Sequence, residues 1–303
     1  MELTLDHIVK NFGEKQVLRG ISLKAESGRA LGLLGRNGAG KTTAIRIVMG
    51  VFPADSGQVL LDGKPFDRNR VKIGYLPEER GLYPKKVISE QLVYFGELRG
   101  LRTAEAKRQA KALLERLGME EYLNKKLETL SKGNQQKIQL AVTLINDPDI
   151  VILDEPFSGL DPVNAMLLKD VVREQIAKGK IVFFSSHQMN YIEEFCDEIA
   201  ILNRGNIVLN GSLRDIKRAN RRGQILLDSP ELERVNRFVT EHCAELTRKT
   251  ERQQGGLLVT LRNPEQKNAL LRALSEANLE LDRFGVYEPS LNDIFVRYTE
   301  EGI

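Results

Sequence analysis

The stretch GRNGAGKTT at residues 35–43 decides the fold, because it fits the pattern G-x-x-x-x-G-K-[ST] of a phosphate-binding loop. A short apolar run at residues 30–34 comes directly before it and predicts a strand that leads into the loop. Glycines let successive main-chain N–H groups turn toward phosphates, and the helix that follows presents its positive end to the same anion. The stretch therefore predicts a nucleoside triphosphate site; the alternative is a glycine-rich turn that fits the pattern by chance.

Individual residues of this loop match separate parts of a magnesium–ATP ligand. Lys41 can reach the outer phosphates, and Thr42 offers a hydroxyl to Mg²⁺ at the start of the helix. These residues predict a nucleoside triphosphate and Mg²⁺ as ligands, and the family resemblance described below implies that the nucleotide is ATP. The other loop residues that we expect to bind the nucleotide are Gly35, Asn37, Gly38, Gly40 and Thr43.

A second apolar run, at residues 150–153, delivers two adjacent carboxylates at its end. Its mostly β-branched residues predict a strand that is buried on both faces, and ligands bind at the carboxyl edge of such parallel strands. Asp154 is then placed to hold Mg²⁺ through its water shell, and Glu155 to orient and polarise the water that attacks the γ-phosphate. Taken alone, the pair is also compatible with a solvated turn after a core strand.

The stretch LSKGNQQ at residues 130–136 leads into a helical pattern of apolar residues. Ser131 and Gly133 at the helix start suggest a second anion site, although an ordinary helix N-cap has the same appearance. Ser131 lies 23 residues before Asp154. Because the phosphate loop precedes this stretch and the acidic strand follows it, the stretch resembles the signature sequence of ATP-binding cassette (ABC) ATPases.

The resemblance covers about residues 1–215 and extends to further motifs of the family in the family's order. SGLD at residues 158–161 resembles the D-loop, which implies a nucleotide-side role for Asp161. His187 follows an apolar strand pattern 33 residues beyond Asp154 and resembles the switch histidine. Phe12 matches the aromatic residue that stacks on adenine, a contact worth about 1–3 kcal/mol, although from the residues alone it reads as a core side chain.

Two positions depart from the common family pattern. Glu78 follows Tyr-Leu-Pro where many members have glutamine, and its carboxylate is a stronger candidate ligand for Mg²⁺ than an amide. The signature reads LSKGN in place of LSGGQ, which keeps Ser131 and Gly133. Both variants, and the stretch YLPEERGLYP at residues 75–84, resemble the branch typified by sodium and multidrug efflux cassettes.

The resemblance implies an α/β fold of the P-loop NTPase type with two domains. The ABC ATPase domain at residues 1–215 would have a mixed or parallel sheet core, an antiparallel β region and a helical subdomain at about residues 85–145. A basic linker is expected at residues 216–222, where KRANRR could alternatively contact phosphates or anionic lipid head groups. Residues 223–303 predict a small C-terminal α+β accessory domain without a catalytic motif.

Composition is consistent with a peripheral subunit. The longest apolar runs are far shorter than a membrane span, and the N-terminal residues lack a signal-peptide pattern. The 45 basic and 42 acidic residues give a net charge of +3, so nucleic acid is not an expected partner. The expected location is the cytoplasmic face of the cell membrane, reached through a partner, and two isolated cysteines predict buried thiols.

In the family, each ATP lies between the phosphate loop of one cassette and the signature of another. The resemblance therefore implies a head-to-tail dimer with a second copy or a homologous cassette, and integral membrane permease subunits as partners. The helical subdomain would receive a coupling helix of the permease, with Leu82 and Tyr83 either exposed for that contact or closing the subdomain core. The leading hypothesis is an ATP-hydrolysing subunit of an exporter; the alternative is a soluble ABC ATPase that acts on nucleic acid or ribosomes. A nucleotide kinase or GTPase would leave Ser131 and His187 unexplained.

Overall fold

The structure, a computed structural model, describes residues 1–79, 81–221, 223–253 and 256–300. Arg80 of the predicted YLPEERGLYP stretch and Arg222 of the predicted linker lie outside the described residues. The chain divides into two compact units, of which the first comprises Met1–Leu213 with the residues from Tyr298 onward, and the second Arg214–Arg297. Each unit has a buried hydrophobic core of its own.

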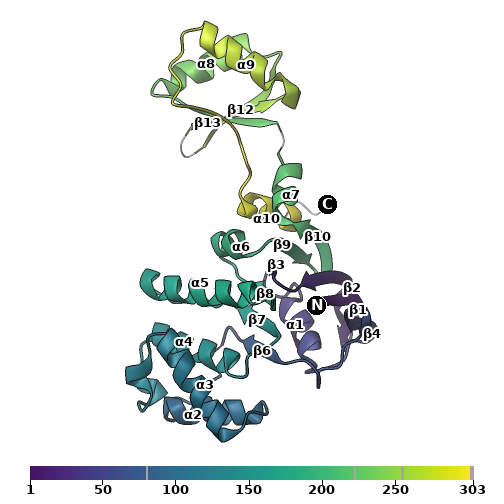
Figure 1. The fold of residues 1–303 in the computed structure, drawn as a ribbon. Coiled ribbons are helices and arrows are strands. Elements are labelled where there is room, and N and C mark those ends of the chain that lie inside the picture. Colours follow the sequence, from purple (N-terminus) through teal and green to yellow (C-terminus); the bar gives the residue numbers. More distant parts are fainter. Residues whose placement is uncertain (80, 222, 254–255, 301–303) are drawn as a thin grey trace. The chain divides into compact units, whose positions relative to one another are not determined.

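A six-stranded sheet forms the centre of the first unit and carries the phosphate loop (Figure 1). Its strand order is β10-β9-β3-β8-β7-β6, with every neighbouring pair parallel except β9 and β10. The continuous apolar runs become the buried inner strands, as a sheet covered on both faces requires. The bounds are β3 (Ala30–Gly35), β6 (Ile73–Leu76), β7 (Ile150–Asp154), β8 (Ile181–Ser185), β9 (Glu198–Asn203) and β10 (Asn206–Ser212).

A second, antiparallel sheet of the first unit has the order β2-β1-β4-β5. Alternate residues of β1 and β2 point into the core that this sheet shares with helix α1 and the six-stranded sheet. The two sheets together confirm the predicted mixed sheet with an antiparallel β region. The strands are β1 (Glu2–Phe12), β2 (Lys15–Glu26), β4 (Ser56–Leu61) and β5 (Lys64–Pro65).

Helices α2, α3 and α4 pack together as a helical subdomain, which Figure 1 shows at the far side of the six-stranded sheet from β1 and β2. Among the described residues, no helix is both long and apolar enough to cross a membrane. The α-helices of the first unit are α1 (Lys41–Met49), α2 (Ile88–Leu98), α3 (Thr103–Arg116), α4 (Lys132–Leu144), α5 (Pro162–Ala177) and α6 (Met189–Phe195); 3₁₀ turns span Glu120–Tyr122 and Leu127–Thr129.

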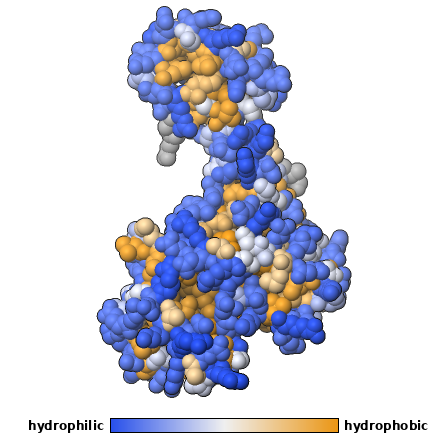
Figure 2. Space-filling view, in the orientation of Figure 1, coloured by the Kyte–Doolittle hydropathy of each residue, from blue (hydrophilic) through white to orange (hydrophobic). Residues whose placement is uncertain are grey.

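The second unit is an antiparallel sheet of order β12-β13-β11-β14 that packs against two helices. Helix α8 buries Val235 and Val239 against this sheet, as expected for an amphipathic surface helix. Figure 2 shows hydrophobic residues grouped between hydrophilic ones on the visible face of this unit. The elements are β11 (Gln224–Asp228), α8 (Leu232–His242), β12 (Thr247–Gln253), β13 (Gly256–Leu261), a 3₁₀ turn (Pro264–Gln266), α9 (Lys267–Glu276) and β14 (Arg283–Val286).

The structure adds detail to two expectations about the second half of the chain. Part of the predicted linker at residues 216–222 is helical, because α7 spans Leu213–Ala219, and the residues of α7 from Arg214 onward cluster with the second unit. The last helix, α10 (Leu291–Glu300), is shared: its residues up to Arg297 cluster with the second unit and the residues from Tyr298 onward with the first. Cys196 and Cys243 are buried free thiols, as predicted, and burial raises the pKa of both.

Candidate functional site

A cavity of about 660 Å³, here called the nucleotide cavity, lies at the carboxyl edge of the six-stranded sheet. The whole phosphate loop, residues 35–43, lines one side of it. The other lining residues come from the ends of neighbouring strands and from β2, and they are Lys15, Val17, Glu78, Asp154, Glu155, Ser185, Ser186 and His187. The structure thus brings together every predicted residue of the phosphate loop with Glu78, Asp154, Glu155 and His187.

Strand register explains why these distant residues meet. Leu153 of β7 pairs with Leu76 of β6, and Asp154 pairs with Ser185 of β8. Because parallel strands end at the same edge, the residues that follow each of them share one rim. Gly35 ends β3 in the same sheet, so the phosphate loop opens onto this rim.

The phosphate loop needs glycine where its backbone turns. Gly38 and Gly40 have φ values of +79° and +115°, which L side chains rarely adopt. A Cβ atom at Gly40 would also lie 2.6 Å from the Leu18 side chain. These constraints let the loop wrap tightly into α1, whose first residue is Lys41. The N-terminus of α1, with its free N–H groups, therefore faces the cavity as a ready-made anion site.

The side chain of Lys41 folds back onto the phosphate loop. Its Nζ atom donates to the carbonyl oxygen of Gly35 at 2.6 Å and lies 3.4 Å from that of Arg36. Burial lowers the pKa of Lys41, while Asp154 and Glu155 act in the opposite direction. An anion in the cavity would favour the charged ammonium further, so the lysine is suited to a phosphate ligand.

Glu155 is buried and held from several sides. Its Oε2 atom accepts from the Ser186 hydroxyl at 3.0 Å, and Oε1 accepts from the main-chain N–H of His187 at 2.6 Å. The Nδ1 atom of His187 lies 2.9 Å from the same Oε1. Glu155 itself has φ +50°, a strained conformation that clusters at functional sites. This fixed carboxylate, oriented by a histidine, has the arrangement of a positioned general base.

Asp154 is a second buried carboxylate beside Glu155. Burial raises its pKa, and the negative charges of Glu78 and Glu155 add to that shift. The same surroundings raise the pKa of Tyr75 to about 12, through burial and through Asp154. Ser185 and Lys41 lower the pKa of Asp154 but do not cancel the rise. Two buried carboxylates beside the exposed Glu78 favour a bound cation, so a cation would suit the complete site.

The donors at this rim fit Mg²⁺. Thr42, Glu78 and Asp154 offer the oxygen ligands that this ion prefers, and Mg²⁺ usually takes only one or two carboxylates together with water and phosphate oxygens. In the described part of the chain, no three His, Cys, Asp or Glu side chains form a metal site on their own. The buried hydroxyl of Ser185 has no hydrogen-bond partner of normal geometry among the described residues, so a polar ligand would satisfy it.

Phe12 is not a core residue, contrary to the interpretation from the residues alone. It ends β1 with 48% of its surface exposed. Its ring packs edge-on against Phe52 at 5.4 Å, and Lys10 Nζ lies 5.7 Å from its centroid. Phe12 does not line the nucleotide cavity itself, but an aromatic ring that is half exposed can stack on a base.

Ser131, Gly133 and Asp161 do not line the nucleotide cavity. They form a separate group, here called the capping cluster, at the starts of α4 and α5. Ser131 accepts from the N–H of Asn134 at 3.3 Å, and Asp161 accepts from that of Asn164 at 2.9 Å. A Cβ atom at Gly133 would lie 3.3 Å from Asn164, so the two helix starts are packed together.

Sequence reasoning missed several lining residues. Ser185 and Ser186 directly precede His187 at the end of a buried strand, so their position was available as a signal. Lys15 and Val17 lie on β2 and carry no motif. Tyr75 precedes Leu-Pro-Glu on β6, but its closeness to Asp154 depends on strand register.

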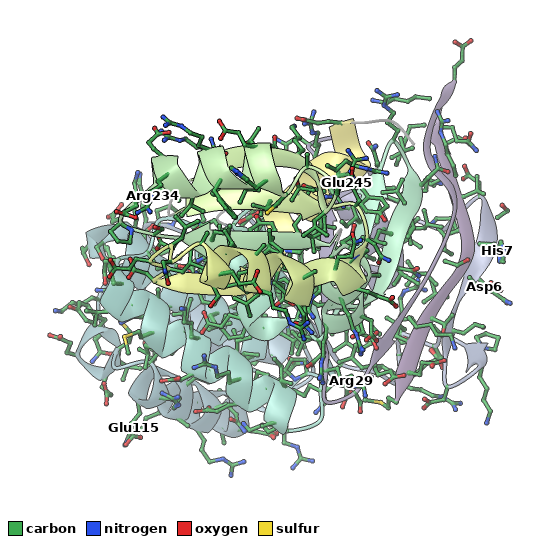
Figure 3. The ribbon with its side chains drawn as sticks, turned by 90° about the horizontal axis from the view of Figure 1, so that it is seen from above. Asp6, His7, Arg29, Glu115, Arg234 and Glu245 are labelled. Atoms are coloured by element: carbon green, nitrogen blue, oxygen red, sulfur yellow. The ribbon has the colours of Figure 1, made fainter. Side chains whose placement is uncertain are left out.

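The three histidines of the chain have different surroundings. His187 lines the cavity, whereas His7 lies beside Asp6 on β1, with Nδ1 2.7 Å from the carboxylate (Figure 3). His242 stacks on Phe238 at a centroid distance of 4.8 Å in the second unit. Of the three, only His187 lines the nucleotide cavity.

Comparison with known proteins gives the same assignment for both halves of the chain. A family profile described as ABC transporter matches residues 18–158, and one described as the C-terminal domain of DrrA1-3-like ATP-binding proteins matches residues 211–299.

Relatives extend the match to nearly the full length. The chain is 40% identical to the uncharacterized ABC transporter ATP-binding protein YhaQ of Bacillus subtilis, over 97% of each chain. It is 30% identical to the Nod factor export ATP-binding protein I of Ralstonia nicotianae, over 98% of this chain and 93% of that one. A solved structure of the ATP-binding subunit of an ABC transporter superposes with a TM-score of 0.66 at 30% identity, covering 72% of this chain and 93% of the other. The resemblance predicted from the motifs is therefore confirmed: the chain belongs to the ABC transporter ATP-binding proteins, and it carries a DrrA1-3-like C-terminal domain.

Proposed function

We propose that this protein hydrolyses ATP as the nucleotide-binding subunit of an exporter, and that it drives a separate membrane permease. One observation carries the proposal: the phosphate loop, Asp154, Glu155 and His187 all line a single cavity. Export is supported by the relative from Ralstonia nicotianae, whose name states export, and by the efflux-type motif around Glu78.

The proposed hydrolysis divides the work among the lining residues. Lys41 and the N–H groups at the start of α1 bind the β- and γ-phosphates. Glu155 orients a water molecule for in-line attack and accepts its proton, while His187 and Ser186 hold the carboxylate in place. Bound Mg²⁺, held by Thr42, Asp154 and Glu78, would neutralise charge on the phosphate oxygens.

We further propose that two cassettes are needed for a complete site. The capping cluster of one chain contains Ser131 and Gly133 but lies outside that chain's own nucleotide cavity. In a head-to-tail dimer, with a second copy or a homologous cassette, the start of α4 would face the γ-phosphate in the partner's cavity. Binding of ATP would then close the dimer and hydrolysis would release it.

An exposed aromatic groove in the helical subdomain is the proposed permease contact. A hollow of about 340 Å³ is lined by Tyr83, Lys86, Glu90, Gln91 and Tyr94. Tyr83 and Tyr94 are 51% and 47% exposed, and their rings stand 6.5 Å apart. Of the two interpretations of Tyr83, exposure favours the contact surface, and an amphipathic coupling helix of the permease would fit such a groove. This contact would hold the protein at the cytoplasmic face of the membrane.

The experiment that tests this function is capture of the partner. Tagged Glu155→Gln protein is incubated with ATP and detergent-solubilised membranes of its host, and the copurifying proteins are identified by mass spectrometry. We expect one polytopic membrane protein in equal amount, and a lower recovery with the additional change Tyr94→Glu. Leu271→Glu, on an exposed residue of the second unit, is the control for added charge.

Recovery of ribosomal proteins or nucleic acid in place of a membrane protein would contradict the proposal. It would favour the alternative, a soluble ABC ATPase that acts on nucleic acid or ribosomes. The net charge of +3 over 303 residues gives that alternative no support.

A further inference from the structure

The last helix of the chain ends against the phosphate loop. Arg36, the second residue of that loop, lines the nucleotide cavity, and its guanidinium Nη2 forms an ion pair with the carboxylate of Glu300 in α10. Two residues that are 264 positions apart in sequence are thus joined at the edge of the candidate ATP site.

A second contact fixes the same helix end. The side-chain amide of Asn203 donates to the carbonyl oxygens of Tyr298 and Thr299, at 3.3 and 3.4 Å. Both carbonyls belong to the last described turn of α10, so Asn203 ties that turn to the end of β9. Thr299 is buried there.

Strand register places the two anchors side by side. Leu202 of β9 pairs with Gly35 of β3, so Asn203 and Arg36 are the next residues of two neighbouring parallel strands. Asn203 contacts main-chain carbonyls of α10, and Arg36 pairs with the carboxylate of Glu300 in the same helix. A carboxylate in the last turn of a helix interacts unfavourably with the helix dipole. Glu300 therefore does not stabilise α10 through the dipole, and its favourable interaction is the ion pair with Arg36.

We propose that Glu300 is a positioning residue that acts through Arg36 and lowers the affinity of the nucleotide cavity for MgATP. The inference rests on the proposed function and adds a regulator to the same site. While Glu300 pairs with the guanidinium, one positive charge at the cavity rim is neutralised.

The first test is Glu300→Gln in the full-length protein. Both partners are about half exposed, so the expected effect is modest: Kd and KM for MgATP fall by about two- to fivefold, and kcat is unchanged. The fall should be present at about 0.02 M salt and disappear at about 0.5 M, because exposed charges are screened. Glu300→Asp should restore wild-type affinity.

Two further variants separate positioning from a general charge effect. In the Arg36→Gln background, adding Glu300→Gln should have a smaller effect than in the wild type, since the residue through which it acts is gone. Glu198→Gln is the control for loss of one carboxylate charge: Glu198 pairs with Arg29, which also pairs with Glu26, at the other end of β3. Figure 3 labels Arg29. This control should leave the Kd for MgATP unchanged.

The outcomes are distinct. An unchanged or raised Kd in Glu300→Gln, or an equal fall in both Arg36 backgrounds, would overturn the role of Glu300 while leaving ATP hydrolysis intact. A wild-type protein that neither binds nor hydrolyses ATP would overturn the proposed function and this inference together.

Discussion

The nucleotide cavity and the capping cluster differ in how far one chain completes them. Around the cavity, Lys41, Asp154, Glu155 and His187 converge from different elements on one space. In the capping cluster, Ser131 accepts from a main-chain N–H of its own helix, and Asp161 accepts from both the main-chain N–H and the side-chain amide of Asn164. The first group shares one cavity within a single chain, whereas the second, which we propose binds the γ-phosphate of a second cassette, lies outside that cavity.

The two groups are therefore expected to affect the stability of the folded protein in opposite directions. The carboxylates at the cavity are buried close to one another, which is costly without a cation. The capping cluster is ordinary helix-start chemistry, which stabilises the fold whether or not a phosphate is bound. Substitutions in the nucleotide cavity and in the capping cluster should therefore have separable effects on the rate of hydrolysis, on ATP binding and on the stability of the fold.

The largest effect is expected for Glu155→Gln. The amide keeps the size and the hydrogen bond from His187 but cannot accept a proton, so hydrolysis should fall by about 10²- to 10⁴-fold while ATP binding is retained. Steady-state phosphate release and equilibrium ATP binding measure the two quantities. Glu121→Gln, at an exposed glutamate, is the control, and near wild-type hydrolysis by Glu155→Gln would remove the assignment of a general base.

Lys41→Ala should act on binding. It removes the half-buried cation that would face the phosphates, so the Kd for ATP should rise by about 30-fold or more, the equivalent of at least about 2 kcal/mol. Titration with a fluorescent ATP analogue checks this. Unchanged affinity would mean that Lys41 remains hydrogen-bonded to Gly35 in the bound state and does not contact phosphate.

Ser131→Asp separates the two roles of the capping cluster. Aspartate is as good a helix N-cap as serine, so the melting temperature should stay the same. Its negative charge would repel a γ-phosphate presented by a second cassette, and we expect hydrolysis to fall about tenfold, which corresponds to about 1.4 kcal/mol. Full activity in this variant would indicate that the start of α4 is only a cap.

Asp154→Asn should stabilise the nucleotide-free protein at neutral pH. The raised pKa of Asp154 means that its charged form is disfavoured in the folded state, so removal of the charge is favourable above that pKa and has no effect once pH falls well below it. A gain of about 1 kcal/mol would raise the melting temperature by about 2–4 °C.

Asp147→Asn is the matched comparison of opposite sign. Lys180 holds the pKa of Asp147 below its usual range, so this variant should lose stability at neutral pH, and the loss should vanish as pH falls through the lowered pKa. Thermal melts of both variants across pH check the pair of signs. A destabilised Asp154→Asn at neutral pH would contradict the account of the buried carboxylates.

Much of the fold could be predicted because the decisive elements are local. The run IVIL before Asp154 and the run ALGLL before Gly35 are apolar throughout, as only doubly covered strands are, and both became inner strands. Strand β12 was not predicted, because TRKTERQ has no apolar alternation and pairs with β13 through main-chain groups. Much of helix α7 was interpreted as a linker, because its many charged residues leave few apolar positions to reveal the helical spacing.

The candidate site could be predicted where a sequence motif carries the chemistry. It could not be predicted where a contact depends on which strands lie side by side in the sheet. Lys41 and the acids Asp154 and Glu155 follow from their spacing and strand context. The contact between Arg36 and Glu300 depends on β3 lying beside β9, which no local pattern reveals. For Phe12 the interpretation from the residues alone was wrong, since an aromatic at a strand end is exposed here.

The most direct test of the account is the mass in solution of purified Glu155→Gln protein with and without MgATP, measured by light scattering after gel filtration. We predict a monomer without nucleotide and a dimer with saturating ATP, and we predict that the additional change Ser131→Asp weakens the dimer. A monomer that binds ATP at saturation but never pairs, with itself or with a copurified homologous cassette, would contradict the claim that the capping cluster of a second chain completes the nucleotide cavity.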